Sequence, residues 1–341
     1  MIIIGKVRTL MQNREPSFKT INYMFRPKKQ IERKILIEFF QNMKHKLKIN
    51  ISEYQYIGLG SIYYYDFILF HKYLNIRDMV SLDNKKCCKR FEFNKPFDFI
   101  TFENMSTNEF LLNNELDKKS FIWFDYDSQL FFYSKKNNLF FNTEEIFDDI
   151  RIITKKCKEQ DLFILTVNIK IQETFFDHIK FKDDFLNKYD EYLSEQYKKV
   201  EEITFGNYPL IIQNIIINIF RNNEKFQPLK FRKLFSFIYQ DNAPMYTIGG
   251  IFSKNDLSDK LIEKDSLFEA DENKLVDINV PLLTYCEKMK LDKNILTIKK
   301  KLNSLNEEEI IKLLDFEMKP YELKSYLNYY RYYPQYYEGI I

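Results

Sequence analysis

The sequence predicts an α/β fold in which helices cover both faces of a mostly parallel sheet. Between residues 55 and 168, five short apolar runs alternate with helical patterns. Repeated strand–helix units build a parallel sheet, because each helix returns the chain to the same edge. Two further β-type runs, 231–240 and 244–252, are separated by so few residues that they favour an antiparallel hairpin. Together the runs predict a seven-stranded, mostly parallel sheet with a terminal antiparallel hairpin.

The first element expected is an amphipathic helix over residues 27–47. Pro27 suits a first helical turn, and apolar side chains recur at helical spacing from Ile31 onward. A basic, hydrogen-bonding face of the same helix is formed by Arg26, Lys29, Gln30 and Arg33.

From residue 55 the expected elements follow in alternation. The predicted strands are 55–58, 79–83, 98–103, 120–125 and 161–168. The predicted helices are 62–75, 84–90, 106–116 and 143–159. In the second half, helical patterns cover 173–203, 209–221 and, as one or two helices, 294–318.

These patterns divide the chain into three parts. Residues 1–50 form an N-terminal helical segment, and 51–255 form the sheet domain with a helical insertion at 173–222. Residues 256–341 are a helical and tyrosine-rich C-terminal extension, a candidate for capping a sheet edge or for a homodimer contact.

Composition excludes several classes of protein. Hydrophobic residues make up 45% of the 341 residues, too many for a disordered chain. A net charge of +3 does not predict a nucleic-acid binder. The four cysteines have no CxxC spacing and the three histidines no HExxH spacing, so no zinc site is expected. Because no run of 18 apolar residues occurs, we expect a soluble, cytoplasmic protein without a membrane contact.

A turn with two glycines follows the first predicted strand. Gly58, Gly60 and Ser61 lie between that strand and the next helix, and Asp83 ends the second strand. Glycine lets the backbone approach a ligand closely, and a strand-end carboxylate accepts hydrogen bonds from ribose hydroxyls. This order predicts a nucleoside site. The alternatives are a simple tight turn and an ordinary strand-end residue.

Taken together, these features resemble class I S-adenosylmethionine-dependent methyltransferases. More narrowly, residues 25–33 (FRPKKQIER), 56–61 (YIGLGS), 90–96 (RFEFNKP) and 123–127 (WFDYD) are similar to a group of bacterial proteins described as putative O-methyltransferases. The narrow resemblance spans residues 20–170, and the class-level one extends to 252. It implies a Rossmann-like sheet and S-adenosyl-L-methionine as the cofactor, and it leaves the methyl acceptor unidentified.

The resemblance also implies roles for particular residues. Gly58, Gly60 and Ser61 would pass under the methionine part of the cofactor, and Asp83 would bind its ribose. Departures occur at Tyr56, where many family members have an acidic residue, and at the third glycine of the fuller pattern, where Ile62 stands. A nicotinamide-binding oxidoreductase is disfavoured because Tyr63 stands where that fingerprint needs glycine.

In the family, the residues after the third strand contact the adenine. Asn104 and Met105 are therefore candidates for that contact. Asn104 could equally precede a helix that is capped by Ser106 with Glu109.

Asp125 and Asp127 follow the fourth strand, where class I enzymes place groups that face the transferred methyl. Asp125 is a candidate general base or, with Asp127 and Asn168, a metal ligand; an exposed loop explains the pair as well. On the N-terminal helix, Arg26 or Lys29 could meet the cofactor carboxylate, or belong to a solvated helix face.

The leading hypothesis is methyl transfer from S-adenosyl-L-methionine to an oxygen of an unidentified acceptor. The alternative is a non-catalytic methyltransferase-fold binding protein or partner subunit of a multi-gene system. The Asn/Asp-Pro-Pro-Tyr motif of amino-methylating DNA enzymes is absent, which argues against DNA amino groups as acceptors.

Overall fold

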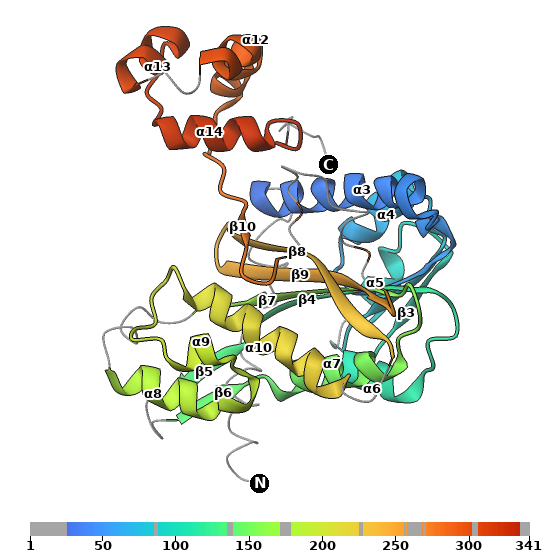
Figure 1. Cartoon of the computed structure of the whole chain (residues 1–341). Helices are drawn as coiled ribbons and strands as arrows, with labels where there is room; N and C mark the ends of the chain where they lie inside the picture. Colours follow the sequence, from blue (N-terminus) through green and yellow to red (C-terminus); the bar gives the residue numbers. More distant parts are fainter. Residues whose placement is uncertain are drawn as a thin grey trace.

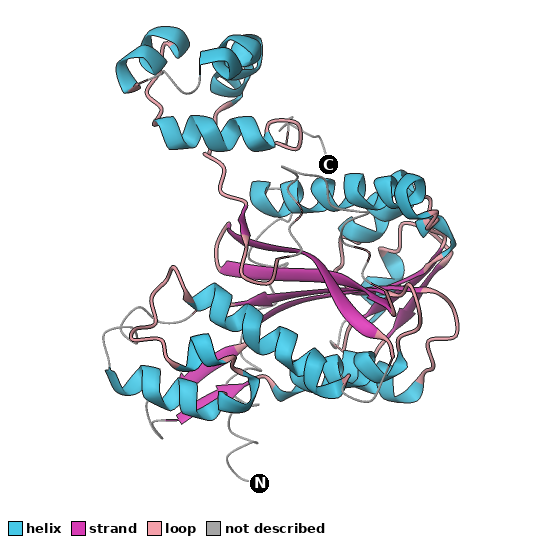
Figure 2. Ribbon diagram, in the orientation of Figure 1, coloured by secondary structure: helices cyan, strands magenta, loops and turns pink. Residues whose placement is uncertain are grey.

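The computed structural model describes residues 26–84, 88–134, 139–170, 179–224, 228–255, 257, 268, 271–301 and 306–334. A twisted central sheet has helices on both faces, and a small group of helices lies beyond one face (Figures 1 and 2). Within the predicted N-terminal segment 1–50, residues 1–25 lie outside the described residues. No helix within the described ranges has both the length and the apolar character that a membrane crossing requires.

The sheet has eight strands in the order β10-β8-β9-β7-β4-β1-β2-β3. Their bounds are β1 (Gln55–Leu59), β2 (Asp78–Leu82), β3 (Ile100–Glu103), β4 (Ser120–Gln129), β7 (Leu162–Asn168), β8 (Lys230–Gln240), β9 (Pro244–Ser253) and β10 (Val276–Asp277). Strand β9 is antiparallel to both β7 and β8, and the other neighbouring pairs are parallel. The mostly parallel sheet and its hairpin are therefore confirmed. The eighth strand was not predicted, because the two residues of β10 are too few to show a strand period.

Two apolar layers enclose the sheet. Along β4, Phe121 and Trp123 belong to one buried cluster and Ile122 and Phe124 to the other, so this strand is buried on both faces. The first layer contains α3 (Pro27–Leu47), α4 (Tyr65–Leu74) and α5 (Cys88–Phe93). The second contains α6 (Thr107–Asn113), α7 (Glu144–Lys156) and α10 (Tyr208–Asn223).

The strand order places a topological switch between β1 and β4. The chain runs from β1 to β2 and β3 on one side, then returns to build β4 and β7 on the other. Because β1 and β4 are parallel, their carboxyl ends meet at the same edge of the sheet. In open α/β sheets, ligands bind in the crevice outside these ends. The sheet therefore positions a candidate site beside residues 58–61 and Asp125.

The helical pattern over 173–203 gives shorter pieces than predicted. In the described part of this segment they are α8 (Ile179–Lys188), a 3₁₀ turn (Asp190–Tyr192) and α9 (Glu195–Lys198). Polar side chains of α10 form hydrogen bonds with the residues that interrupt the helical pattern. The Asn214 amide donates to Ser194 Oγ at 2.6 Å, and the Asn218 amide donates to the Tyr192 carbonyl at 2.8 Å. A small hairpin, β5 (Phe131–Ser134) with β6 (Leu139–Asn142), was also not predicted.

The C-terminal extension holds α12 (Tyr285–Lys301), α13 (Glu307–Leu314) and α14 (Pro320–Tyr329). Its tyrosines attach it to the rest of the chain. The Tyr329 hydroxyl donates to the Asp277 carbonyl of the edge strand β10 at 2.8 Å, and the Tyr332 hydroxyl donates to Glu38 on α3 at 2.9 Å. These contacts join the end of α14 to the sheet edge and the turn after it to α3. Figure 1 shows where α14, β10 and α3 lie.

The N-terminus of α3 is capped from a distant turn. Asp241, between β8 and β9, accepts hydrogen bonds from the backbone N–H groups of Lys28 and Lys29 at 3.2 and 3.1 Å. A carboxylate in this position also interacts favourably with the helix dipole. The hairpin end thereby fixes where α3 begins.

Replacing this cap should destabilise the protein moderately. We expect Asp241→Ala to lower the free energy of unfolding by about 1–2 kcal/mol, as loss of an N-cap does. Urea titration followed by circular dichroism measures this. The exposed neighbour Asn242 supplies a matched control, Asn242→Ala. Equal stability of the two variants would contradict a capping role for Asp241.

Candidate functional site

The glycine turn and Asp83 lie side by side at the carboxyl edge of the sheet. In the β1–β2 register, Gly58 is opposite Ser81 and Leu59 is opposite Leu82. The Gly60 N–H continues this pairing by donating to the Leu82 carbonyl at 2.6 Å. Asp83 follows directly and is 8% exposed. The structure thus brings together the turn and the carboxylate that the sequence assigned to one site.

Close packing inside the protein requires glycine both at position 58, which lies within β1, and at position 60, which follows it. A Cβ on Gly60 would lie 2.7 Å from Ser81 Oγ and 3.1 Å from the Leu82 carbonyl. A Cβ on Gly58 would lie 2.4 Å from the hydroxyl of Tyr56, whose ring covers this part of the strand. Tyr56 therefore occupies the space above Gly58.

Beyond β3, the structure confirms a capping box. Ser106 Oγ accepts from the Glu109 N–H at 3.2 Å, and the Glu109 carboxylate accepts from the Ser106 N–H at 2.9 Å. Asn104 is exposed and Met105 is partly buried against the core. Their contact with adenine stays a prediction.

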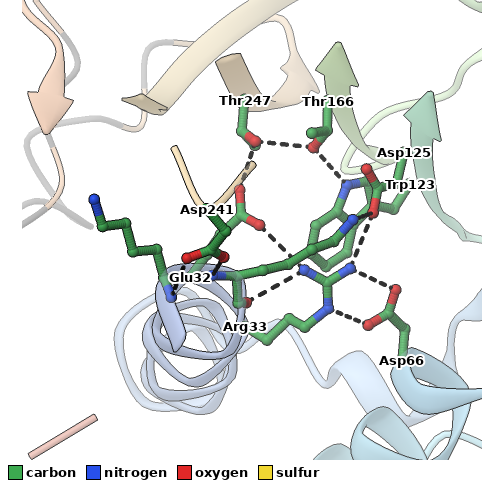
Figure 3. Close-up of polar contacts among 10 residues, drawn as sticks. Glu32, Arg33, Asp66, Trp123, Asp125, Thr166, Asp241 and Thr247 are labelled. Carbon is green, nitrogen blue, oxygen red and sulfur yellow. Dashed lines mark hydrogen bonds and ion pairs between the residues drawn. The ribbon is translucent and has the colours of Figure 1, made fainter. Parts of the chain in front are cut away.

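Five charged side chains meet between α3, α4 and β4, and we call them the charge cluster. They are Lys29, Glu32 and Arg33 from α3, Asp66 from α4 and Asp125 from β4. Asp125 Oδ2 accepts from Lys29 Nζ at 2.5 Å and from Arg33 Nη2 at 3.0 Å. Arg33 also makes a bidentate contact with Asp66, with Nη2 to Oδ2 at 2.9 Å (Figure 3).

Arg33 is the centre of this cluster and is 1% exposed. Its guanidinium carbon lies 4.8 Å from the centre of the Trp123 ring. Its Nη1 donates to Glu32 Oε2 at 3.2 Å and to the Lys29 carbonyl at 3.3 Å. Such planar, multidentate contacts suit a guanidinium better than an ammonium group.

A chain of hydrogen bonds links the cluster to the far strands of the sheet. Trp123 Nε1 donates to Thr166 Oγ1 at 3.0 Å, and Thr166 and Thr247 share a hydrogen bond of 2.9 Å. The Thr247 hydroxyl donates to Glu32 Oε1 (Figure 3). Strands β4, β7 and β9 are thereby coupled to α3.

Burial and charge act on the carboxyl groups in different ways. Burial opposes ionisation of Asp125, but Lys29 and Arg33 outweigh it and hold its pKa below the usual value. Burial raises the pKa of Glu32 to about 7, against the lowering effects of Arg33 and of the hydrogen bond from Thr247. The cluster contains three carboxyl groups and only two cations, and Glu32 is the group with the least compensation.

Among the other predicted site residues, Arg26 precedes α3 and Asp127 is exposed. The Asn168 amide reaches the Asp127 backbone carbonyl at 3.5 Å rather than its side chain. Within the described ranges, no group of three His, Cys, Asp or Glu side chains could hold a metal ion.

Sequence reasoning did not assign Glu32 or Asp66 to the site. One signal was present: Ile35, Leu36 and Ile37 of α3 are apolar in succession, so the side of α3 that is buried is wide. Glu32 and Arg33 lie one turn earlier on the faces of Leu36 and Ile37, and they are therefore buried as well. Buried charges are normally paired, which makes Glu32 and Arg33 candidates for a polar network.

Comparison with known proteins identifies the family. A family model described as "Putative O-methyltransferase" matches residues 21–341. The chain belongs to this family. The match includes α12–α14, which the sequence resemblance did not reach. With the mostly parallel sheet and the antiparallel β9 between β7 and β8, this O-methyltransferase family member has a Rossmann-like class I methyltransferase fold.

Three solved structures illustrate the remote similarity of this family member to known folds. The N-methyltransferase NodS from Bradyrhizobium japonicum WM9 is 7% identical over 62% of this chain and 95% of its own, with a TM-score of 0.32. The YcgJ protein from Bacillus subtilis is 11% identical over 64% of this chain and 99% of its own, with a TM-score of 0.35. TrmK of M. capricolum, solved with S-adenosyl-homocysteine, is 11% identical over 84% of this chain and 96% of its own, with a TM-score of 0.30. Nothing about activity follows from scores this low. No curated protein matches the sequence.

Proposed function

We propose that this protein is an S-adenosylmethionine-dependent methyltransferase that transfers a methyl group to an oxygen of an acceptor not yet identified. One observation carries the proposal. The glycine turn at the end of β1 lies beside Asp83, which follows β2, and beside Asp125, at the topological switch point of the sheet. Asp125 lies within β4 rather than after it as predicted, two residues past the last pair that β4 makes with β1. The family description supports oxygen as the methyl-accepting atom.

The residues at this edge suit the chemical groups of the cofactor. Asp83 can accept hydrogen bonds from the ribose hydroxyls. The Asp125 side chain, 15% exposed, can attract a positively charged group from the crevice. When bound, the cofactor supplies a methyl group on a sulfonium. The protein must then hold the acceptor oxygen in line with that methyl and exclude water.

The role of Asp125 as a general base stays a prediction, and the two cations beside it make proton transfer to this carboxylate less favourable. A carboxylate with a lowered pKa is a weak proton acceptor. Its contacts favour a second role, in which Asp125 holds Lys29 and Arg33 in place and presents negative charge to the crevice.

These ion pairs also favour a second candidate function, a non-catalytic binding protein or partner subunit that retains the fold. Cofactor binding alone would not distinguish the two. A methyl-transfer assay with labelled donor and pooled cell extract would distinguish them, because only an enzyme transfers the label to an acceptor.

The ribose contact can be tested by removing the carboxylate of Asp83. We expect Asp83→Ala to weaken binding of S-adenosyl-L-methionine by roughly 1.5–3 kcal/mol, the range for a lost hydrogen bond to a charged group. Isothermal titration calorimetry measures this directly. Asp78→Ala is the matched control, because Asp78 begins the same strand at its opposite end, where its carboxylate accepts hydrogen bonds from Gln55 and Lys118. An Asp83→Ala protein with unchanged affinity would remove the ribose assignment.

A further inference from the structure

Glu32 is completely buried beside two cations that already serve other carboxylates. Lys29 contacts Asp125, and Arg33 contacts both Asp125 and Asp66. The Glu32 carboxylate accepts a hydrogen bond from Arg33 Nη1 at 3.2 Å and one from the Thr247 hydroxyl. With all three carboxyl groups ionised, the cluster carries one uncompensated negative charge in the protein interior.

Groups from every neighbouring element face Glu32. They are Lys29 and Arg33 on α3, Asp125 on β4, Thr247 on β9 and Tyr239 on β8; Asp66 on α4 acts through Arg33. Burial is the dominant influence and raises the pKa of Glu32 to about 7. Near neutral pH a proton therefore supplies the missing positive charge for part of the time.

A cation bound next to Asp125 would supply the same charge. Asp125 acts on Glu32 directly, its side chain is 15% exposed, and it lies at the switch-point edge where the cofactor is proposed to bind. S-adenosyl-L-methionine carries a positive sulfonium, whereas S-adenosyl-homocysteine carries an uncharged thioether.

We propose that Glu32 is a specificity residue, which exchanges its proton for the positive charge of the bound methyl donor and so favours the donor over the demethylated product as pH rises. This inference rests on the proposed function. On donor binding, the Glu32 carboxyl releases one proton to solvent and remains as a carboxylate. The sulfonium then replaces the proton as the balancing positive charge of the cluster, and the released proton carries one positive charge to solvent. After methyl transfer the sulfonium charge is gone, and Glu32 takes up a proton again.

Calorimetry on the wild-type protein tests the exchange. Titrations with S-adenosyl-L-methionine and S-adenosyl-homocysteine are made at pH 6, 7 and 8, in two buffers that differ in ionisation enthalpy. We expect donor affinity to rise roughly three- to tenfold from pH 6 to 8 with net proton release, as linkage requires. Product affinity should change much less. Donor binding without proton release would overturn the inference and leave the proposed function intact. No binding of either compound would overturn both.

A conservative substitution identifies the group responsible. Glu32→Gln resembles the protonated acid in shape and still accepts from Thr247, so its donor affinity should not vary with pH in this range. Glu38→Gln is the control, because Glu38 lies on the same helix but contacts Tyr332 and Arg331 at its outer side. Unchanged pH dependence in Glu32→Gln would overturn the assignment. If this variant does not fold, Thr247→Val serves instead, and its loss of the hydrogen bond should shift the pH midpoint of donor affinity upward.

A second readout needs no ligand. A carboxyl group with a raised folded-state pKa contributes stability that is complete below its unfolded value of 4.5 and is lost as pH rises through about 7. The urea midpoint of the wild type should therefore fall from pH 5 to 8 relative to that of Glu32→Gln. Parallel curves would overturn the proton-binding role of Glu32.

Discussion

Arg33→Leu is expected to lower the free energy of unfolding by about 3–5 kcal/mol, the cost of removing one partner from a buried ion pair. The variant would leave Asp66, Asp125 and Glu32 with Lys29 as the remaining cation of the cluster. It would also remove the guanidinium that packs over Trp123. Urea unfolding followed by tryptophan fluorescence suits this measurement, because the chain has one Trp and it lies at the cluster.

Arg151→Leu is the matched control for this prediction. Arg151 also combines an ion pair, with Asp148, and a position over an aromatic ring, Phe147, but it lies on the exposed side of α7. Exposed pairs of this kind contribute about 0–1 kcal/mol. If both arginine variants lost the same small amount, the charge cluster would not be a stabilising centre.

Asp125→Asn is expected to lower turnover by about 10²–10⁴ if Asp125 is the general base, the usual share of acid–base catalysis. The assay is transfer of label from the methyl donor to pooled cell extract. We also expect this variant to lose thermal stability, because Lys29 and Arg33 lose their shared carboxylate. Asp127→Asn is the control, since Asp127 is exposed two residues later on the same strand.

The pH dependence of stability gives Asp125 a separate signature. Its pKa is lowered in the folded protein, so its stabilising contribution is present above the unfolded pKa and is lost as pH falls through the folded value. Asp125→Asn should therefore unfold with a weaker dependence on acid than the wild type. An identical acid dependence would show that the two ion pairs contribute nothing to stability.

A double variant separates catalysis from stability. Lys29→Met combined with Asp125→Asn removes one charge of each sign and leaves Arg33 with Asp66. We expect it to recover part of the stability lost in the single Asp125 variant. If turnover recovers as well, Asp125 is a positioning residue, and if turnover stays low, the carboxylate itself takes part in the reaction.

The sequence by itself determined the layout of this protein. The bounds of α3, the strand–helix alternation and the β8–β9 hairpin were predictable, because each depends on periodicity or turn length within a short stretch. The meeting of the glycine turn with Asp83 was also predictable, since parallel neighbouring strands place their carboxyl ends at one edge. The capping box at Ser106 follows from residue spacing alone.

Only the tertiary structure decided what surrounds the site. The basic face of α3 and Asp125 each had a solvated alternative in the sequence, yet Lys29 and Arg33 of that face form one buried cluster with Asp125, Asp66 and Glu32. Asp241 caps α3 from a turn more than two hundred positions away. The ionisation of a buried carboxyl group depends on which distant residues exclude water from it and which cations compensate its charge. Local periodicity carries no information about either, because both arise when separate elements pack together.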